Sequence, residues 1–458
     1  MLRKQHPTDQ YHHDGTLTMV HPTPRRDEDT GKSHPQTLLS ALRPTIAGWL
    51  SRYPVDLRRR GNHPFRKQLI RDYMNRQTHF LLLISLAALL FVSCKQVNKT
   101  GSADNTASDD TAALELKYAE GFRVTSQDNY RLVEIENPQE EEAEEKDKIY
   151  RFALVPRGSK PQGIPSDYTI IETPVKGVIC MTSLQLSGFL KLRALDQIVG
   201  IASAKRLFDK DLKKRLDEGM ILKIGKEGNF DDEIVLASNP DAILVSLSKR
   251  GGFDKLEDSG IPLIPYMGYL ETSPLAQAEW IKFIGMLTGK TAEANKIFAE
   301  TEKNYLDAQA LIAGKKGSEP QVFYGKMHGD NWYAMGGESF IAKIIDDAGG
   351  KYFIDDDRTG GVNLDFEQVY AQGEHCDYWV IQNKGKEKQT YENLLEEDAH
   401  YGDFRAFKQK KIICCEYSHT PVNELSPMEP DIVLKDFIKV FYPDVLPDYT
   451  PKYYQLME

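Results

Sequence analysis

The stretch spanning residues 290–315 constrains the fold more than any other part of this chain. Five side chains suited to a packed face recur in it at intervals of three or four, as one face of a helix requires; they are Ile297, Thr301, Tyr305, Ala308 and Ile312. At about 1.5 Å of rise per residue, a helix of roughly 20 residues is about 30 Å long, enough to reach from one compact lobe to another. The stretch therefore predicts a bridging helix between two lobes; the alternative is a surface helix inside a single domain.

Short apolar runs alternate with helical segments on both sides of this helix. Strands are expected at residues 176–181, 198–202, 242–246, 261–266, 320–324, 378–382 and 411–415. Helices are expected at residues 182–192, 230–237, 253–259, 339–348, 366–372 and 431–441. Alternation at this pitch is typical of βαβ units with largely parallel sheets. The predicted fold class is therefore α/β, with two Rossmann-like lobes whose parallel sheets are bridged by one long rigid helix.

The balance of charge limits the partners of the chain. Its 458 residues carry a formal net charge of −10 and are 40% hydrophobic. Binding to nucleic-acid phosphates needs a basic field, which the sequence after Cys94 does not supply. We therefore expect two or three domains with packed cores and no nucleic-acid partner.

The amino-terminal region has the anatomy of a lipoprotein signal peptide, predicted at residues 74–93. A short basic region precedes an apolar run at residues 80–92, which is shorter than the roughly 20 residues of a membrane span. The ending Phe-Val-Ser-Cys resembles a bacterial lipobox, so Cys94 is the expected lipidation site; a weak transmembrane anchor is the alternative. Residues 94–113 are polar and predict a flexible tether. Residues 1–73 are predicted to be a non-native upstream extension.

An accessory strand segment is predicted at residues 114–165, ahead of the first lobe. Residues 130–135 and 149–155 alternate or run apolar as strands do, and the acidic run at residues 136–148 indicates a solvated connection between two antiparallel strands. The sequence contains no zinc-ligand spacing, Gly-x-Ser-x-Gly elbow, P-loop or His-Glu-x-x-His motif. We therefore expect no enzyme activity, no catalytic residues, no metal site and no resident cofactor.

Four segments in a particular order and spacing carry a resemblance to a known family. They lie at residues 178–201, 224–244, 329–350 and 362–381. With them, the chain resembles the periplasmic solute-binding proteins of ABC importers for iron–siderophore complexes, haem and cobalamin. The resemblance implies an N-terminal α/β lobe at residues 166–289, the bridging helix at 290–315, a C-terminal α/β lobe at 316–446 and a tail at 447–458.

The same resemblance implies one exposed glutamate on each lobe for docking to the membrane permease. Glu233 stands at the expected position in the N-terminal lobe and Glu367 in the C-terminal lobe. Two separated carboxylates make a two-point electrostatic dock, which chiefly sets orientation and the rate of association.

The candidate ligand-binding residues come from the loops that follow the predicted strands, because open parallel sheets place ligands at the carboxyl ends of their strands. Basic side chains pair with anionic groups, and Trp and Tyr present flat amphipathic faces, so the mixture suits a bulky, aromatic, negatively charged metal chelate. A histidine could instead ligate haem iron or cobalt. The candidates are Met181, Thr182, Arg206, Lys249, Arg250, Tyr266, Tyr269, Lys326, His328, Trp332, Tyr333, Lys384, Tyr417 and His419.

The resemblance therefore implies the lipid-anchored substrate-binding component of an ABC importer, on the periplasmic side of the cell envelope. We expect a monomer that captures a ferric siderophore-type metal chelate between its lobes and delivers it to a membrane permease and its ATPase. Binding of cobalamin or haem is the alternative within this class. A metalloenzyme that holds a metal cluster is the alternative outside it.

Overall fold

The computed structural model describes residues 113–136, 148–202, 204, 206–226, 229–246, 254–257, 259–315, 317 and 319–458. These residues belong to one compact unit, Ser102–Glu458. The predictions for residues 1–73, the signal peptide at 74–93, Cys94, nearly all of the tether, Lys249 and Arg250 lie outside the described residues.

The accessory segment forms a sheet of its own. Its strands are β1 (Phe122–Ser126), β2 (Arg131–Ile135), β3 (Tyr150–Pro156) and β4 (Thr169–Thr173), in that spatial order. β2 pairs antiparallel with β3, which confirms the pairing expected across the acidic connection. β4 adds to β3 in parallel, so the sheet extends past the predicted boundary. Val133 and Ile135 alternate along β2 and pack into the core of the N-terminal lobe.

The second sheet forms the N-terminal lobe and is wholly parallel, as predicted. Its strands stand in the order β11 (Leu263–Pro265), β10 (Ala242–Val245), β5 (Val178–Cys180), β6 (Ile198–Ile201) and β7 (Leu222–Lys223). The connections contain α2 (Ser183–Lys191), η3 (Leu195–Gln197), α3 (Lys210–Asp217), β8 (Gly225–Lys226), β9 (Asn229–Phe230), α4 (Asp232–Ala237) and α5 (Asp254–Glu257). After β11 follow η4 (Gly268–Leu270), α6 (Pro274–Glu279) and α7 (Ile281–Thr288).

The C-terminal lobe repeats this plan with one antiparallel edge strand. Its sheet has the order β15 (Lys351–Tyr352), β12 (Gln321–Tyr324), β17 (Tyr378–Asn383), β18 (Ile412–Glu416) and β19 (Tyr454–Leu456). Only β19 in this sheet runs antiparallel, so the predicted tail is instead part of the lobe. Tyr454 is buried in the lobe core, which explains why the end of the chain is held.

A smaller antiparallel sheet and several helices complete this lobe. The sheet consists of β13 (Lys326–His328), β14 (Asn331–Met335) and β16 (Gly361–Leu364). The helices are α9 (Phe340–Asp347), α10 (Phe366–Gly373), α11 (Tyr391–Glu397), η6 (Ala399–Asp403), α12 (Arg405–Lys408), α13 (Val422–Leu425), η7 (Ser426–Met428) and α14 (Pro430–Phe441). The sequence did not indicate the three-stranded sheet.

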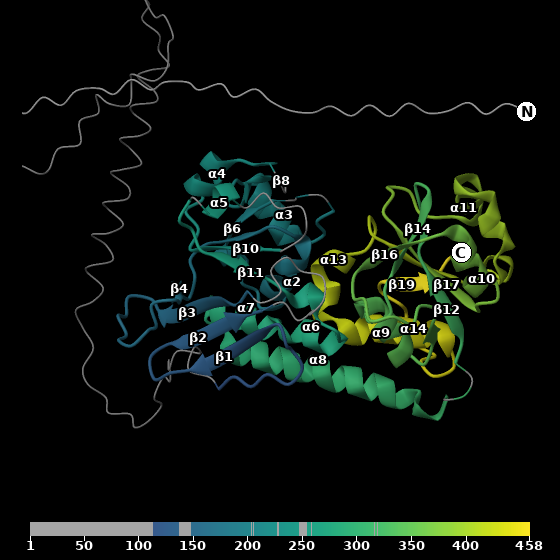
Figure 1. Ribbon diagram of the computed structural model, residues 1–458, viewed down its shortest axis with the longest axis horizontal. Helices are drawn as coiled ribbons and strands as arrows, with labels where there is room; N and C mark the ends of the chain where they lie inside the picture. The colour runs from purple at the N-terminus through teal and green to yellow at the C-terminus, as the bar shows by residue number, and fades with distance from the viewer. Residues whose placement is uncertain are drawn as a thin grey trace, which may run out of the picture. The chain divides into compact units, whose positions relative to one another are not determined.

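The bridging helix is confirmed as α8 (Thr291–Leu311), followed by η5 (Ala313–Lys315). Ala294 and Phe298, in its first half, belong to the core of the N-terminal lobe. Tyr305 and Ala308, in its second half, belong to the core of the C-terminal lobe. The helix lies against α7 at one end and α14 at the other (Figure 1). One amphipathic helix therefore contributes to two cores.

The lobes also meet at a second place, through α13 and η7. Both pack against α2 of the N-terminal lobe. Met428, in η7, is 2% exposed and belongs to the core of the N-terminal lobe, although the chain around it belongs to the C-terminal one. The bridging helix is therefore not the sole connection between the lobes.

Candidate functional site

The candidate site begins where parallel strands of both lobes end. In the N-terminal lobe, β6 leads to the loop that carries Arg206. In the C-terminal lobe, β17 leads directly to Lys384, and β18 leads directly to Tyr417. Because neighbouring parallel strands end at the same edge of a sheet, Lys384 and Tyr417 are placed side by side.

The structure brings four of the predicted residues together from the two lobes. The Arg206 guanidinium donates a hydrogen bond to the backbone carbonyl of Lys384. The Lys384 ammonium lies 5.9 Å from the centre of the Tyr417 ring. Tyr417 in turn interacts electrostatically with Arg206 and with Tyr333. We refer to Arg206, Tyr333, Lys384 and Tyr417 as the interlobe cluster.

The cluster combines accessible cations with phenol groups. Arg206 and Lys384 are exposed, Tyr333 is 40% exposed and Tyr417 is half-buried. Burial raises the pKa of Tyr417 well above its ordinary value; Cys415 and Tyr333 raise it further, and Arg206 lowers it by less. Tyr417 therefore keeps its proton at neutral pH and offers a neutral hydroxyl, not a phenolate. Cations beside neutral hydroxyl groups can bind an anionic, aromatic molecule.

A buried polar network beneath the cluster fixes the loop that carries Lys384. The Asn383 amide donates to the Glu416 carboxylate and to the Glu387 carbonyl, each at 2.7 Å, and accepts from the Gly385 N–H at 2.8 Å. Glu416 also accepts from the backbone N–H of Gln389 at 2.9 Å. The loop is therefore held at both ends. Glu416 is not among the residues predicted from the sequence; its one signal there is a carboxylate directly after an apolar run.

Trp332 and Tyr333 are neighbours on β14 and point to opposite faces. Trp332 is fully buried, and its indole Nε1 donates to the Tyr324 carbonyl at 2.8 Å. The prediction that Trp332 lines the ligand site is therefore wrong, because its ring lies in the core of the C-terminal lobe. The Tyr333 phenol ring lies over Gly361 on β16, where a larger side chain would displace the ring from this position.

The other candidates have separate surroundings. Tyr266 is 4% exposed and packs against Trp280, with ring centres 4.9 Å apart, so the prediction that it contacts ligand is also wrong. Lys326 is paired with Glu397 at 2.6 Å. His419 is exposed, and its Nε2 lies 3.0 Å from the Lys386 carbonyl.

The remaining four candidates are Met181, Thr182, Tyr269 and His328. Met181 is buried and Thr182 half-buried at the start of α2, where the Gln185 side chain accepts both of their N–H groups. Tyr269 is half-buried, and His328 is exposed at the end of β13. The described contacts do not join Met181, Thr182 or His328 to the cluster.

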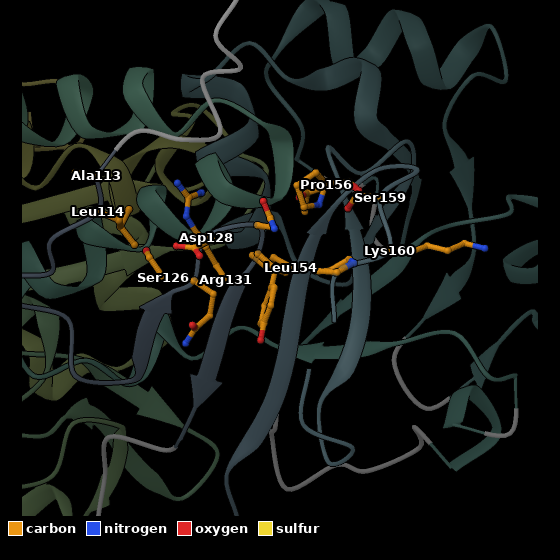
Figure 2. Close-up of a pocket in the computed structure, with 14 residues that line it drawn as sticks. Ala113, Leu114, Ser126, Asp128, Arg131, Leu154, Pro156, Ser159 and Lys160 are labelled. Carbon is orange, nitrogen blue, oxygen red and sulfur yellow. The ribbon is translucent and has the colours of Figure 1, made fainter. Parts of the chain in front are cut away.

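A cavity of about 720 Å³ lies in the accessory sheet and not at the interlobe cluster (Figure 2). The β1–β2 turn, the ends of β3 and β4 and the start of the described chain form its wall. Its lining residues are Ala113, Leu114, Ser126, Gln127, Asp128, Asn129, Tyr130, Arg131, Leu154, Pro156, Ser159, Lys160, Pro161 and Thr173. None of them is a predicted ligand-binding residue, and none follows a strand of either parallel sheet. The cavity is therefore distinct from the predicted site.

Among the helices described, none is long and apolar enough to cross a membrane. Among the described side chains, no group of three or more His, Cys, Asp or Glu residues is placed to hold a metal ion.

Two α/β lobes joined by a long helix that contributes to both cores define the architecture of a class, that of the solute-binding proteins. The chain belongs to the periplasmic binding protein family, whose model matches residues 178–417. This confirms the resemblance drawn from the four segments. It also places the chain among binding proteins of the cell envelope and not among enzymes.

Relatives and solved structures agree with this membership. An uncharacterized lipoprotein of Methanocaldococcus jannaschii is 24% identical over 302 residues, which cover 63% of this chain and 70% of the relative. A periplasmic binding protein from Veillonella parvula has a TM-score of 0.51 at 16% identity and covers 70% of this chain and 98% of its own. A periplasmic heme binding protein from Pseudomonas aeruginosa has a TM-score of 0.51 at 17% identity. The match covers 62% of this chain and 98% of the heme binding protein. These two likenesses show the fold.

Proposed function

We propose that this protein is the substrate-binding component of an ABC importer and that it captures an anionic, aromatic metal chelate of the ferric siderophore type at the interlobe cluster. The observation that carries the proposal is the contact between the lobes at Arg206 and Lys384, beside the half-buried Tyr417. A ligand there touches both lobes at once. Haem and cobalamin are the alternative cargoes, and the heme-binding neighbour supports keeping haem among them.

The chemistry of the cluster favours an anionic chelate. Arg206 supplies a planar guanidinium that can bind carboxylate or catecholate oxygens with two hydrogen bonds. Lys384 adds a second positive charge, and Tyr333 adds an exposed ring on which an aromatic group can stack. His419 and His328 are exposed and supply the alternative of axial ligation to haem iron or cobalt.

The experiment that tests the cargo is a calorimetric titration of the chain from Lys95 onward with a ferric catecholate, a ferric hydroxamate, haem and cobalamin. We expect one of the two ferric chelates to bind with one equivalent per chain. Arg206→Ala should weaken that binding roughly 10- to 100-fold, because a hydrogen bond to a charged group contributes about 1.5–3 kcal/mol. Tryptophan fluorescence is a poor readout, since Trp332 is buried.

The matched control is Lys296→Ala, which removes an exposed cation from α8 on the same protein. Its affinity for the chelate should equal that of the wild type. Equal weakening by Lys296→Ala and Arg206→Ala would show that only general positive charge matters. Binding of haem or cobalamin alone would transfer the proposal to that cargo.

We also propose that Glu233 and Glu367 dock the protein onto the permease. Both side chains are exposed, and each lies in the first turn of its helix, α4 or α10. They come from different lobes, as a two-point dock requires.

If the two glutamates dock the protein onto the permease, their removal should reduce import of the chelate without changing the affinity of the protein for it. Glu233→Ala combined with Glu367→Ala should lower chelate uptake by cells about tenfold or more, because coupling energies of roughly 1.5–7 kcal/mol have been measured for close charge pairs across an interface. The affinity of the purified double variant for the chelate should not change. Glu293→Ala with Glu300→Ala on α8 removes two other exposed glutamates as the control. Uptake that falls equally in both double variants would contradict specific docking.

We propose further that Cys94 carries a lipid that holds the protein at the periplasmic face of a membrane. The lipobox-like sequence supports this, as do the curated relatives, which are named lipoproteins. The expected functional form is a monomer.

A further inference from the structure

The segment from α13 to the start of α14 carries two buried carboxylates toward the N-terminal lobe. Glu424 lies in α13 and is 1% exposed; Glu429 precedes α14 and is 8% exposed. Carboxylates are seldom buried so completely unless they are paired or hydrogen-bonded. The partners of these two groups therefore show what they hold.

Glu424 binds the backbone of the N-terminal lobe. Its two oxygens accept the N–H of Phe208 at 2.6 Å and the N–H of Asp209 at 3.1 Å. Asp209 is the N-cap of α3, where its own side chain accepts the N–H of Leu212 at 2.8 Å. The Glu424 carboxylate thus lies at the positive end of α3 and fixes the loop that leads into that helix.

Glu429 makes the second connection. One oxygen accepts from the Lys191 ammonium, at the end of α2, at 2.6 Å. The other accepts from Lys452 at 2.6 Å and from the Tyr453 hydroxyl. Glu429 is therefore shared between a cation of the N-terminal lobe and two donors of the C-terminal lobe.

The loop that Glu424 holds is the loop that carries Arg206. Arg206 has a φ of 57°, a left-handed conformation that non-glycine residues rarely adopt. The surroundings fix this conformation on both sides. Leu207 is buried in the N-terminal core, the next two N–H groups are held by Glu424, and the guanidinium reaches the carbonyl of Lys384.

We propose that Glu424 and Glu429 form an interlobe clasp and that Glu424 is the positioning residue of the interlobe cluster. The clasp holds the two lobes in one arrangement in the absence of ligand, and Glu424 sets the backbone from which Arg206 reaches across. The effect on ligand affinity rests on the function proposed above. The effect on lobe arrangement does not.

The first test measures lobe arrangement alone. Spin labels are attached through Lys214→Cys on α3 and Glu396→Cys on α11, both exposed positions, in the chain from Lys95 onward. Cys180, Cys376, Cys414 and Cys415 are buried and should not react. The wild type should give one narrow distribution of distances. Glu424→Gln, which sets an amide N–H₂ against a backbone N–H, should at least double the width of that distribution.

Two further variants keep this test decisive. Asp211→Asn makes the same chemical change at an exposed position of α3 and should leave the distribution narrow. Lys191→Met removes the contact between Lys191 and Glu429, the other half of the clasp. If Glu424→Gln does not unfold cooperatively and so is not properly folded, the distance distribution of Lys191→Met tests the clasp in its place. A narrow distribution in both Glu424→Gln and Lys191→Met would overturn the clasp.

The second test asks whether Glu424 acts through Arg206. Glu424→Gln should weaken chelate binding about tenfold in the wild type and much less in the Arg206→Ala background, because residues that act together are not additive. Equal losses in both backgrounds would overturn the positioning role. If the wild type binds no chelate and the distribution still widens, the proposed cargo fails and the clasp stands.

Discussion

Trp332→Ala is expected to lower the free energy of unfolding by about 3–5 kcal/mol, the usual cost of removing a large aromatic side chain from a core. The Trp332 ring is fully buried. Its neighbours are Trp379, with ring centres 5.9 Å apart, Phe404 at 5.8 Å and Tyr401 at 5.9 Å. The substitution opens a cavity among these rings and leaves the Tyr324 carbonyl without its donor. Urea denaturation of the chain from Lys95 onward measures the loss.

Tyr333→Ala is the matched control, since the two residues are adjacent on the same strand. Tyr333 is exposed, so its removal should cost less than about 1 kcal/mol of stability. It should instead weaken binding of the chelate, whereas Trp332→Ala should leave the affinity of the remaining folded protein unchanged. If Trp332→Ala instead weakened chelate binding and Tyr333→Ala instead lowered stability, the Trp332 indole, and not the Tyr333 phenol, would face the ligand.

The bridging helix could be predicted because its signal is local and long. Thr301, Tyr305 and Ala308 recur at intervals of four and three and are all buried, so the helical period is visible in the sequence itself. What the sequence could not give is the division of that face between two cores. That division depends on packing against α7 and α14, which lie far away along the chain.

The roles of Trp332 and Tyr333 show where sequence reasoning about the site stops. Adjacent residues of a strand point to opposite faces, so one of them had to face inward. Both are aromatic, and nothing local decides which one is buried. The neighbouring strand β16 determines which of the two rings faces outward, because Gly361 leaves room for the Tyr333 ring on the outer face. The same limit applies to Tyr266, whose ring packs against Trp280, the residue between α6 and α7.

The buried carboxylates were invisible for a different reason. Glu424 is bound to backbone N–H groups more than two hundred positions earlier in the chain. A backbone N–H has no side-chain signature, so no pattern in the sequence marks such a partner. Arg206 was found because a basic residue after a strand is itself a signal, but the group that holds its loop was not.

Glu279→Ala is expected to lower the free energy of unfolding by about 3–5 kcal/mol, the cost of removing one partner of a buried ion pair. Glu279, at the end of α6, is fully buried and pairs with the Lys282 ammonium at 2.6 Å. It also accepts three successive backbone N–H groups, those of Lys117, Tyr118 and Ala119, at 3.0, 2.7 and 2.9 Å. Its loss would leave three backbone donors without their acceptor and would leave the buried Lys282 ammonium with the Glu115 carbonyl, at 2.6 Å, but without its paired carboxylate.

The same denaturation experiment, with hydrogen exchange of residues 117–121, distinguishes a global loss from a local one. Glu300→Ala, at an exposed position of α8, is the control and should change stability by less than about 0.5 kcal/mol. Because Lys282 is 5% exposed and would lose the carboxylate that pairs with it, we expect the whole lobe to lose stability together with the protection of these amides. Faster exchange at residues 117–121 with unchanged global stability would instead mean that Glu279 only fastens the accessory segment and that water reaches Lys282 once that segment has moved.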